Sequence, residues 1–327
     1  MSHLILTTND LSAYRLQPTL LANEVVGFDL RLVPGMLPSE AELAILLEPR
    51  STKHDGDGKH WLDHCCRMGA RRSTNRDRGL LEFCDRFDSI EIWADPQAND
   101  QLILVWLLDV LRPHKEVISK LSLVQADDRI ANYRPDSLAR WKLPVLKISD
   151  RHLALASKAW QAYRGPAPQT CFDLLLQDTT ILPRLRPAMI ALFEELPDSS
   201  NGLGATEQRM LEYLDDGCTD PRELLYAAHF REIFNEREAM DLFDELAQCP
   251  QPLVFGLGET PFDKSEEARW GRYKNGKVAL TKLGQAVVEA EDDFSRHNSI
   301  HRWWGGTHLT NERLWRWDRE TRSLVAP

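Results

Sequence analysis

The sequence lacks the short motifs that identify the commonest nucleotide-binding and hydrolytic enzymes. Its 17 glycines form no G-x-x-x-x-G-K-[ST] loop, no G-x-S-x-G elbow and no G-x-G-x-x-G turn. These absences weigh against a P-loop NTPase, an α/β-hydrolase and a dinucleotide-binding enzyme, and they leave other enzyme classes open.

Other features are equally scarce. No apolar run approaches the roughly 18 residues that a membrane-spanning helix needs, and the first residues show no signal-peptide pattern. The six cysteines form no C-x-x-C pair, which argues against a zinc ribbon or a disulfide framework. The net charge of -10 opposes general attraction to nucleic acid or to an anionic membrane. We therefore expect a cytoplasmic protein without membrane contact, and the charge disfavours nucleic acid as its partner.

The 327 residues, 43% of them hydrophobic and 28% charged, are typical of a globular protein with two or three domains. Turn-forming residues accumulate at positions 197–202 and mark the clearest boundary. We expect an α/β domain over residues 1–145, a helical connector over 146–200, a winged-helix-like domain over 201–296 and a tail over 297–327. The tail holds four of the ten tryptophans and should pack back on the body.

The chain is organised around residues 89–112. A β-rich run at 90–94 is followed by Asp95 and Pro96, and then by a helical pattern that is apolar on every face. Further strands are expected at 3–8, 25–30 and 121–124. Strands that alternate with helices in this way predict a mostly parallel sheet flanked by helices.

The second half shows three helical patterns between residues 206 and 248, followed by Asn275 and Gly276, the strongest two-residue hairpin signal. The sequence therefore predicts a winged helix-turn-helix whose wing is a hairpin over residues 270–280.

These landmarks together resemble a bacterial family classed as domain of unknown function 1835, often joined to a winged-helix-like C-terminal part. The resemblance lies in residues 3–10, in the 92–93 strand with Asp100 and Gln101, in residues 201–207, and in the tryptophan-rich stretch 304–318. Asn9 stands where glycine is commoner in the family, which puts a tight phosphate-cradling turn there in doubt. The resemblance implies an architecture and no established activity.

Polar side chains gather at or just after the predicted strand ends, where a parallel sheet brings them to one edge. They are Asn9, Asp10, Asp29, Asp95, Asp100 and Gln101. Such an edge is a candidate site for a small ligand, with Mg²⁺ as a candidate cofactor because hard cations prefer carboxylate oxygens. The alternative is that these residues are helix caps and turn formers that need no ligand.

The densest basic cluster offers a second candidate site, for phosphate, at Arg67, Arg71 and Arg72. A solvated helix face paired with nearby acids is the simpler interpretation. His60 and His64 share a helical face, but Trp61 occupies the position where a metalloprotease has glutamate, so no metal site is assigned.

The helix that begins near Asn235 would enter the DNA groove in a winged helix. We expect five acidic residues on its exposed face, which disfavours nucleic acid and favours a protein partner or the chain's own α/β domain. They are Glu236, Glu238, Asp241, Asp244 and Glu245. The sequence thus predicts a ligand-binding or regulatory protein. The alternatives are a Mg²⁺-assisted enzyme acting on a nucleotide or phosphoester, and a DNA-binding regulator.

Overall fold

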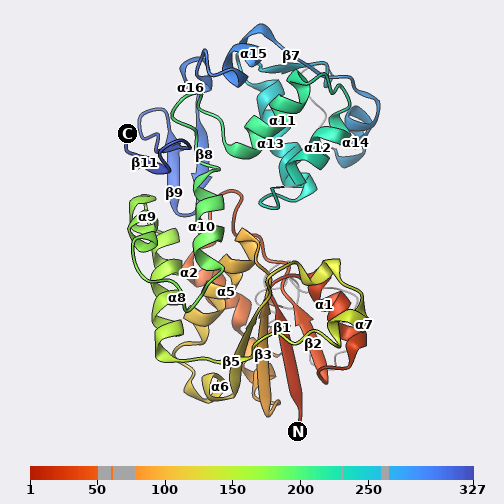
Figure 1. The fold of residues 1–327 in the computed structure, drawn as a ribbon, viewed down its shortest axis with the longest axis vertical. Coiled ribbons are helices and arrows are strands. Elements are labelled where there is room, and N and C mark those ends of the chain that lie inside the picture. Colours follow the sequence, from red (N-terminus) through yellow and green to blue (C-terminus); the bar gives the residue numbers. More distant parts are fainter. Residues whose placement is uncertain (51–59, 62–77, 230, 259–264) are drawn as a thin grey trace. The chain divides into compact units, whose positions relative to one another are not determined.

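The computed structural model describes residues 1–50, 60–61, 78–229, 231–258 and 265–327 (Figure 1). The described chain divides into two compact units. Unit 1 comprises residues 1–32, 37–165 and 173–189, and unit 2 comprises residues 33–36, 166–172 and 190–327. The division falls inside the segment expected to be a helical connector.

Unit 1 is built on a five-stranded sheet in the order β2-β1-β3-β4-β5. Its strands are β1 (His3–Thr7), β2 (Glu24–Gly27), β3 (Ser89–Ala94), β4 (Leu121–Gln125) and β5 (Leu146–Lys147). The first four pair in parallel and β5 joins β4 antiparallel. The predicted mostly parallel sheet flanked by helices is therefore confirmed.

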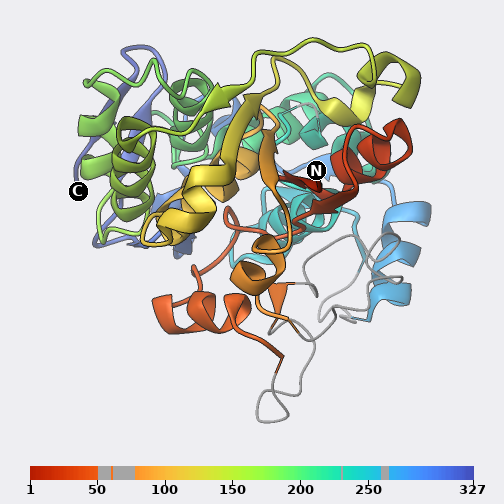
Figure 2. The ribbon, with the colours of Figure 1, turned by 90° about the horizontal axis from the view of Figure 1, so that it is seen from below.

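Helices cover both faces of this sheet. The helical elements up to residue 193 are, in chain order, α1 (Asp10–Leu16), η1 (Gln17–Thr19), α2 (Glu40–Leu47), α4 (Leu80–Cys84), α5 (Ala98–Leu111), α6 (Lys115–Lys120), η4 (Ile130–Asn132), α7 (Pro135–Leu138), α8 (Asp150–Tyr163), α9 (Gln169–Leu175) and α10 (Leu185–Phe193). The last two, α9 and α10, each include residues of both units. In Figure 2, α1 in red and α8 in yellow-green lie on opposite sides of the strands.

Alternation along the strands places different side chains on the two faces. Ile5, Trp93 and Val124 form one cluster with Leu16 of α1 and Leu138 of α7. The other face lies against α5, whose residues 102–108 are all buried as their apolar pattern predicted. Because α8 packs on α5, the central helix is covered from both sides.

From residue 205 onward, unit 2 contains three helices that match the predicted helical patterns, α11 (Ala205–Asp215), α12 (Pro221–His229) and α13 (Glu236–Gln248). Ser39 in unit 1 and Asn235 in unit 2 each precede a helix as its N-cap and form a capping box with the glutamate three residues later. The inner face of α13 is buried through Met240, Phe243 and Leu246.

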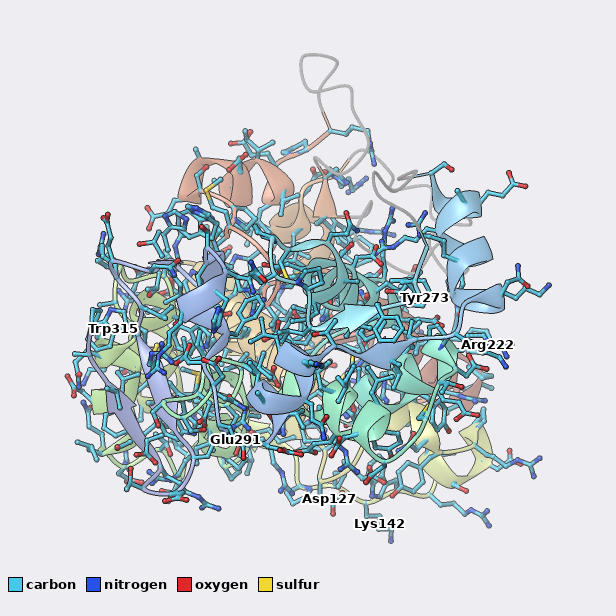
Figure 3. All side chains as sticks on the ribbon, turned by 90° about the horizontal axis from the view of Figure 1, so that it is seen from above. Asp127, Lys142, Arg222, Tyr273, Glu291 and Trp315 are labelled. Carbon is cyan, nitrogen blue, oxygen red and sulfur yellow. The ribbon has the colours of Figure 1, made fainter. Side chains whose placement is uncertain are left out.

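The predicted wing hairpin over residues 270–280 is wrong. Asn275 is the last residue of helix α14 (Glu266–Asn275), and Gly276 is its C-cap. The helix forms because Tyr273, labelled in Figure 3, is fully buried and donates its hydroxyl to Met240 O at 3.1 Å. Strands β6 (Val254–Phe255) and β7 (Ala279–Leu280) pair antiparallel on either side of α14. A two-stranded sheet is present, but a helix occupies the place of the hairpin.

The rest of unit 2 comprises α15 (Lys282–Val288), α16 (Phe294–His297) and the tail strands β8 (His301–Trp304), β9 (Thr307–Thr310), β10 (Arg316–Asp318) and β11 (Ser323–Val325). The strands form two hairpins. Trp304 and Trp317 stack on Phe193 with ring centroids 5.0 and 5.2 Å away. Among the described residues, no helix combines the length and the apolar character needed to cross a bilayer.

Candidate functional site

The strand order creates a topological switch point between β1 and β3. The chain leaves β1 toward β2 on one side of it, and β3 and β4 continue the sheet on the other side. In open α/β sheets ligands bind at this point, beyond the carboxyl ends of the strands. Residues 8–9 follow β1 and residues 95–101 follow β3, so both segments lie at the switch point.

Asn9 joins the two segments. As the N-cap of α1 it accepts the backbone N–H of Ser12 at 2.8 Å, which is the cap role that the sequence suggested. Its Nδ2 group donates to Asp95 and also to Asp100, the latter at 2.8 Å. A single amide therefore holds two carboxylates together.

Asp95 is fully buried, and both of its carboxylate oxygens accept hydrogen bonds. Oδ1 accepts the backbone N–H of Ile130 at 2.8 Å, and Oδ2 accepts from Ser12 Oγ and Asn9 Nδ2. Because these donors follow β1 and β4, Asp95 ties the ends of three neighbouring strands together. Its burial raises its pKa above the ordinary value, and the hydrogen bonds oppose that shift.

Asp100 is the second carboxylate, in the first turn of α5. Its Oδ1 accepts from Thr8 Oγ1 at 2.7 Å and from Asn9. Burial, followed by the charge of Asp95, raises the pKa of Asp100 to about 7. Since Asp95 accepts three donors and Asp100 accepts two, we assign the first proton of the pair to Asp100.

Gln101 is 1% exposed and completes the cluster. Its Nε2 donates to the backbone oxygen of Asp95 at 2.7 Å. Its Oε1 has no hydrogen-bond partner among the described residues. A buried acceptor without a partner costs roughly 1–3 kcal/mol, so a ligand that donated a hydrogen bond to this atom would gain free energy of binding.

The structure brings four of the six candidate residues together, namely Asn9, Asp95, Asp100 and Gln101. Asp10 is half-buried in the first turn of α1, and no hydrogen bond links it to this network. Asp29 is exposed because β2 ends at Gly27, earlier than the sequence suggested. The phosphate candidates Arg67, Arg71 and Arg72, together with His64, lie outside the described residues.

Asp95 is a poor Mg²⁺ ligand. Asn9, Ser12 and Ile130 already direct three hydrogens at its two carboxylate oxygens, and a cation would have to compete with them. Within the described part of the chain, no group of three or more His, Cys, Asp or Glu side chains is arranged to hold a metal ion.

Sequence reasoning missed Thr8, Ser12 and the backbone of Ile130. The position of Ser12 three residues after the N-cap was a usable signal, because that spacing places it beside the end of β1. A main-chain donor such as Ile130 N–H leaves no mark in the sequence. Two cations also act on the pair: Arg31 lowers the pKa of Asp100, and Arg129 lowers the pKa of Asp95.

The acidic face expected on α13 needs correction. Glu236 and Asp241 are exposed, but Glu238 is buried as the N3 residue of its capping box. Arg269 of α14 lies 2.8 Å from Asp241 and 3.0 Å from Asp244, and Arg302 contacts Glu245. Much of the negative charge is therefore paired within unit 2, and charge alone argues less strongly against nucleic acid than the sequence suggested.

No protein-family model matches this sequence, and the search of curated proteins found no significant match. The resemblance to the domain of unknown function 1835 family thus stays a prediction, and the site rests on its geometry.

Proposed function

We propose that unit 1 is a ligand-recognition module that binds a small molecule at the carboxyl ends of β1 and β3. The observation that carries this proposal is the Oε1 atom of Gln101, which is buried and without a partner among the described residues, at the switch point of a parallel sheet. The surrounding network of Asn9, Asp95 and Asp100 supports it by holding the neighbouring strand ends rigid. Preorganisation of this kind lowers the entropic cost of binding.

A thermal-shift screen against a metabolite panel tests the proposal. Compounds that bind the native state raise Tm, and the stabilisation grows with the logarithm of ligand concentration over Kd. Gln101→Met removes the unused acceptor and should reduce the shift. Gln161→Met is the matched control, because it makes the same change on the exposed surface of α8 in the same unit. A hit whose shift is equal in both variants would place the ligand elsewhere and refute the proposal.

For unit 2 we propose protein contacts as the main role. Three aromatic side chains of the described part of unit 2 are well exposed, since Tyr226, Phe255 and Trp270 each keep 45% or more of their surface accessible. Exposed aromatic residues of this size favour protein interfaces. The alternative of DNA binding is tested by gel retardation of a duplex, where salt-sensitive retardation would favour a DNA-binding regulator.

The metal-assisted enzyme is a weaker alternative, because the donors that surround Asp95 oppose a cation there. Hydrolysis of a nucleotide or phosphoester that depends on Mg²⁺ and is lost in Asp100→Ala would favour the enzyme over the binding module.

A further inference from the structure

Backbone N–H groups at the amino end of α5 lack hydrogen-bond acceptors among the described residues. This 14-residue helix begins at the switch point, and its N-cap residue Gln97 makes no capping hydrogen bond through its side chain. The N–H groups of Ala98, Asn99 and Asp100 have no acceptor among the described residues, although all three residues are buried. Helix ends normally satisfy these donors with a side chain, water or a ligand.

Side chains that would commonly supply such acceptors are committed elsewhere. Asn99 reaches away from the helix end, accepting Leu32 N–H at 2.8 Å and donating to Leu30 O at 2.9 Å. Asp100 accepts from Thr8 and Asn9. The three N–H groups of α5 thus form a ready site for a group with several acceptor oxygens, and the positive end of the helix dipole favours an anion.

Gln101 provides the second, independent observation. Because its Nε2 is bonded to Asp95 O, its amide lies at the turn between β3 and α5, beside the first turn of the helix. Its Oε1 accepts hydrogen bonds only, so it calls for a donor on the ligand. A bare anion satisfies the helix end but leaves Gln101 unpaired. An anion attached to a hydroxyl-bearing group satisfies both.

The charges around the site are compatible with an anion. Asp95 and Asp100 supply the negative charge, and Asp10 lies on the neighbouring helix α1. The guanidinium groups of Arg31 and Arg129 act on this carboxylate pair. With one proton on the pair, its negative charge is halved, and Arg31 and Arg129 oppose the charge that remains.

We propose that the first turn of α5 binds the phosphate of a phosphorylated sugar or nucleotide, and that Gln101 accepts a hydrogen bond from a hydroxyl of the same ligand. The inference rests on the proposed ligand-recognition function and adds the chemical class of the ligand. Three N–H groups match the three terminal oxygens of a phosphomonoester.

Thermal shift and titration calorimetry of the full chain test this with ribose 5-phosphate, AMP, inorganic phosphate and ribose. We expect ribose 5-phosphate or AMP to stabilise the protein, inorganic phosphate to do so more weakly, and ribose to have no effect. Stabilisation by AMP alone identifies a nucleotide site, and stabilisation by both identifies a sugar-phosphate site. If neither stabilises the protein, the inference is overturned.

Ala98→Pro is the diagnostic variant, because it removes one N–H group at the first helical position, where proline is tolerated. The extended backbone of Gln97 (φ -64°, ψ 155°) also suits a residue before proline. Since hydrogen bonds to charged groups are strong, affinity for the phosphorylated probe should fall roughly tenfold to a hundredfold. Glu40→Pro is the matched control, because it makes the same change at the first helical position of α2 in the same unit, after the extended residue Ser39 (φ -63°, ψ 162°), and it should bind like wild type.

Gln101→Met is the second variant, for the case that Ala98→Pro does not fold. It should weaken ribose 5-phosphate or AMP while leaving inorganic phosphate unchanged, because only the hydroxyl contact is lost. Equal weakening of both probes would contradict the assignment of Gln101. If only unphosphorylated metabolites stabilise the protein, and Gln101→Met reduces that stabilisation, the phosphorylated ligand class is wrong and the ligand-recognition function stands. If no metabolite stabilises the protein, the ligand class and the ligand-recognition function are both wrong.

Discussion

Thr8 donates its hydroxyl hydrogen to Asp100 Oδ1 at 2.7 Å. Thr8 follows β1 and Asp100 lies in the first turn of α5, so this bond connects the two sides of the topological switch point. The partners of the buried Asp100 carboxylate are thus neutral hydrogen-bond donors, so its protonation should affect the stability of the protein.

The stability of the protein should fall as pH rises from 5 to 8. The folded-state pKa of Asp100, about 7, lies above the ordinary value of 3.8, so the native state retains a proton that the unfolded state releases. The stabilisation is fully present below the unfolded-state pKa and is lost as pH rises through the folded-state pKa. Urea denaturation of wild type and of Asp100→Asn measures it, and the variant should lose less stability over this range. Parallel curves would show that Asp100 does not titrate there.

Asp95→Ala should destabilise the protein by roughly 3 kcal/mol, because it leaves the Ile130 N–H and the Ser12 hydroxyl buried without acceptors. Asn9→Ala should cost less, about 1–2 kcal/mol, since its largest loss is a helix cap. Chemical denaturation compares the two variants. A loss below about 1 kcal/mol for Asp95→Ala would mean that Asp95 does not hold the strand ends together.

Gly27→Ala should destabilise unit 1 by about 1–3 kcal/mol through overpacking. A Cβ atom at this position would lie 2.6 Å from Asn9 O and 2.7 Å from Ala13 Cβ, so the end of β2 and the start of α1 would have to separate. Gly271→Ala is the control: its Cβ meets nothing within 4 Å inside α14, and it should stabilise by about 0.5–1 kcal/mol. Equal effects of the two changes would contradict the close approach.

Ligand binding at the switch point should not require Mg²⁺. Three hydrogen-bond donors already point at the carboxylate oxygens of Asp95, which makes this buried acid a poor Mg²⁺ ligand. Calorimetry of any confirmed ligand in EDTA and in excess Mg²⁺ should return the same Kd for wild type. Binding that disappears in EDTA and returns with Mg²⁺ would favour the metal-assisted enzyme.

The sequence predicted the sheet of unit 1 well, because the parallel strands and the helix after β3 are rich in apolar residues that the fold buries. The hairpin at Asn275 and Gly276 failed because the same two residues suit the end of a helix. Burial of Tyr273 against α13 decided between the two outcomes, and that contact spans more than thirty residues of sequence.

The sequence predicted only part of the candidate site, because some of its contacts also join residues that are far apart in the sequence. Strand ends locate polar residues, so Asn9, Asp95, Asp100 and Gln101 were found. Asp29 was misplaced by the early end of β2, and the role of Ile130 depends on a backbone group in the connection after β4. That connection also carries the exposed residues Asp127 and Lys142, labelled in Figure 3. Its path is set by tertiary contacts that no local pattern records.

Backbone amide chemical shifts give the most direct test of a ligand site at the first turn of α5. A titration of ¹⁵N-labelled protein with ribose 5-phosphate should move the amide resonances of Ala98, Asn99 and Asp100 more than others, with Gln101 side-chain signals shifting too. Saturating shifts confined to residues far from the carboxyl ends of β1 and β3, or no shifts at all, would contradict the account.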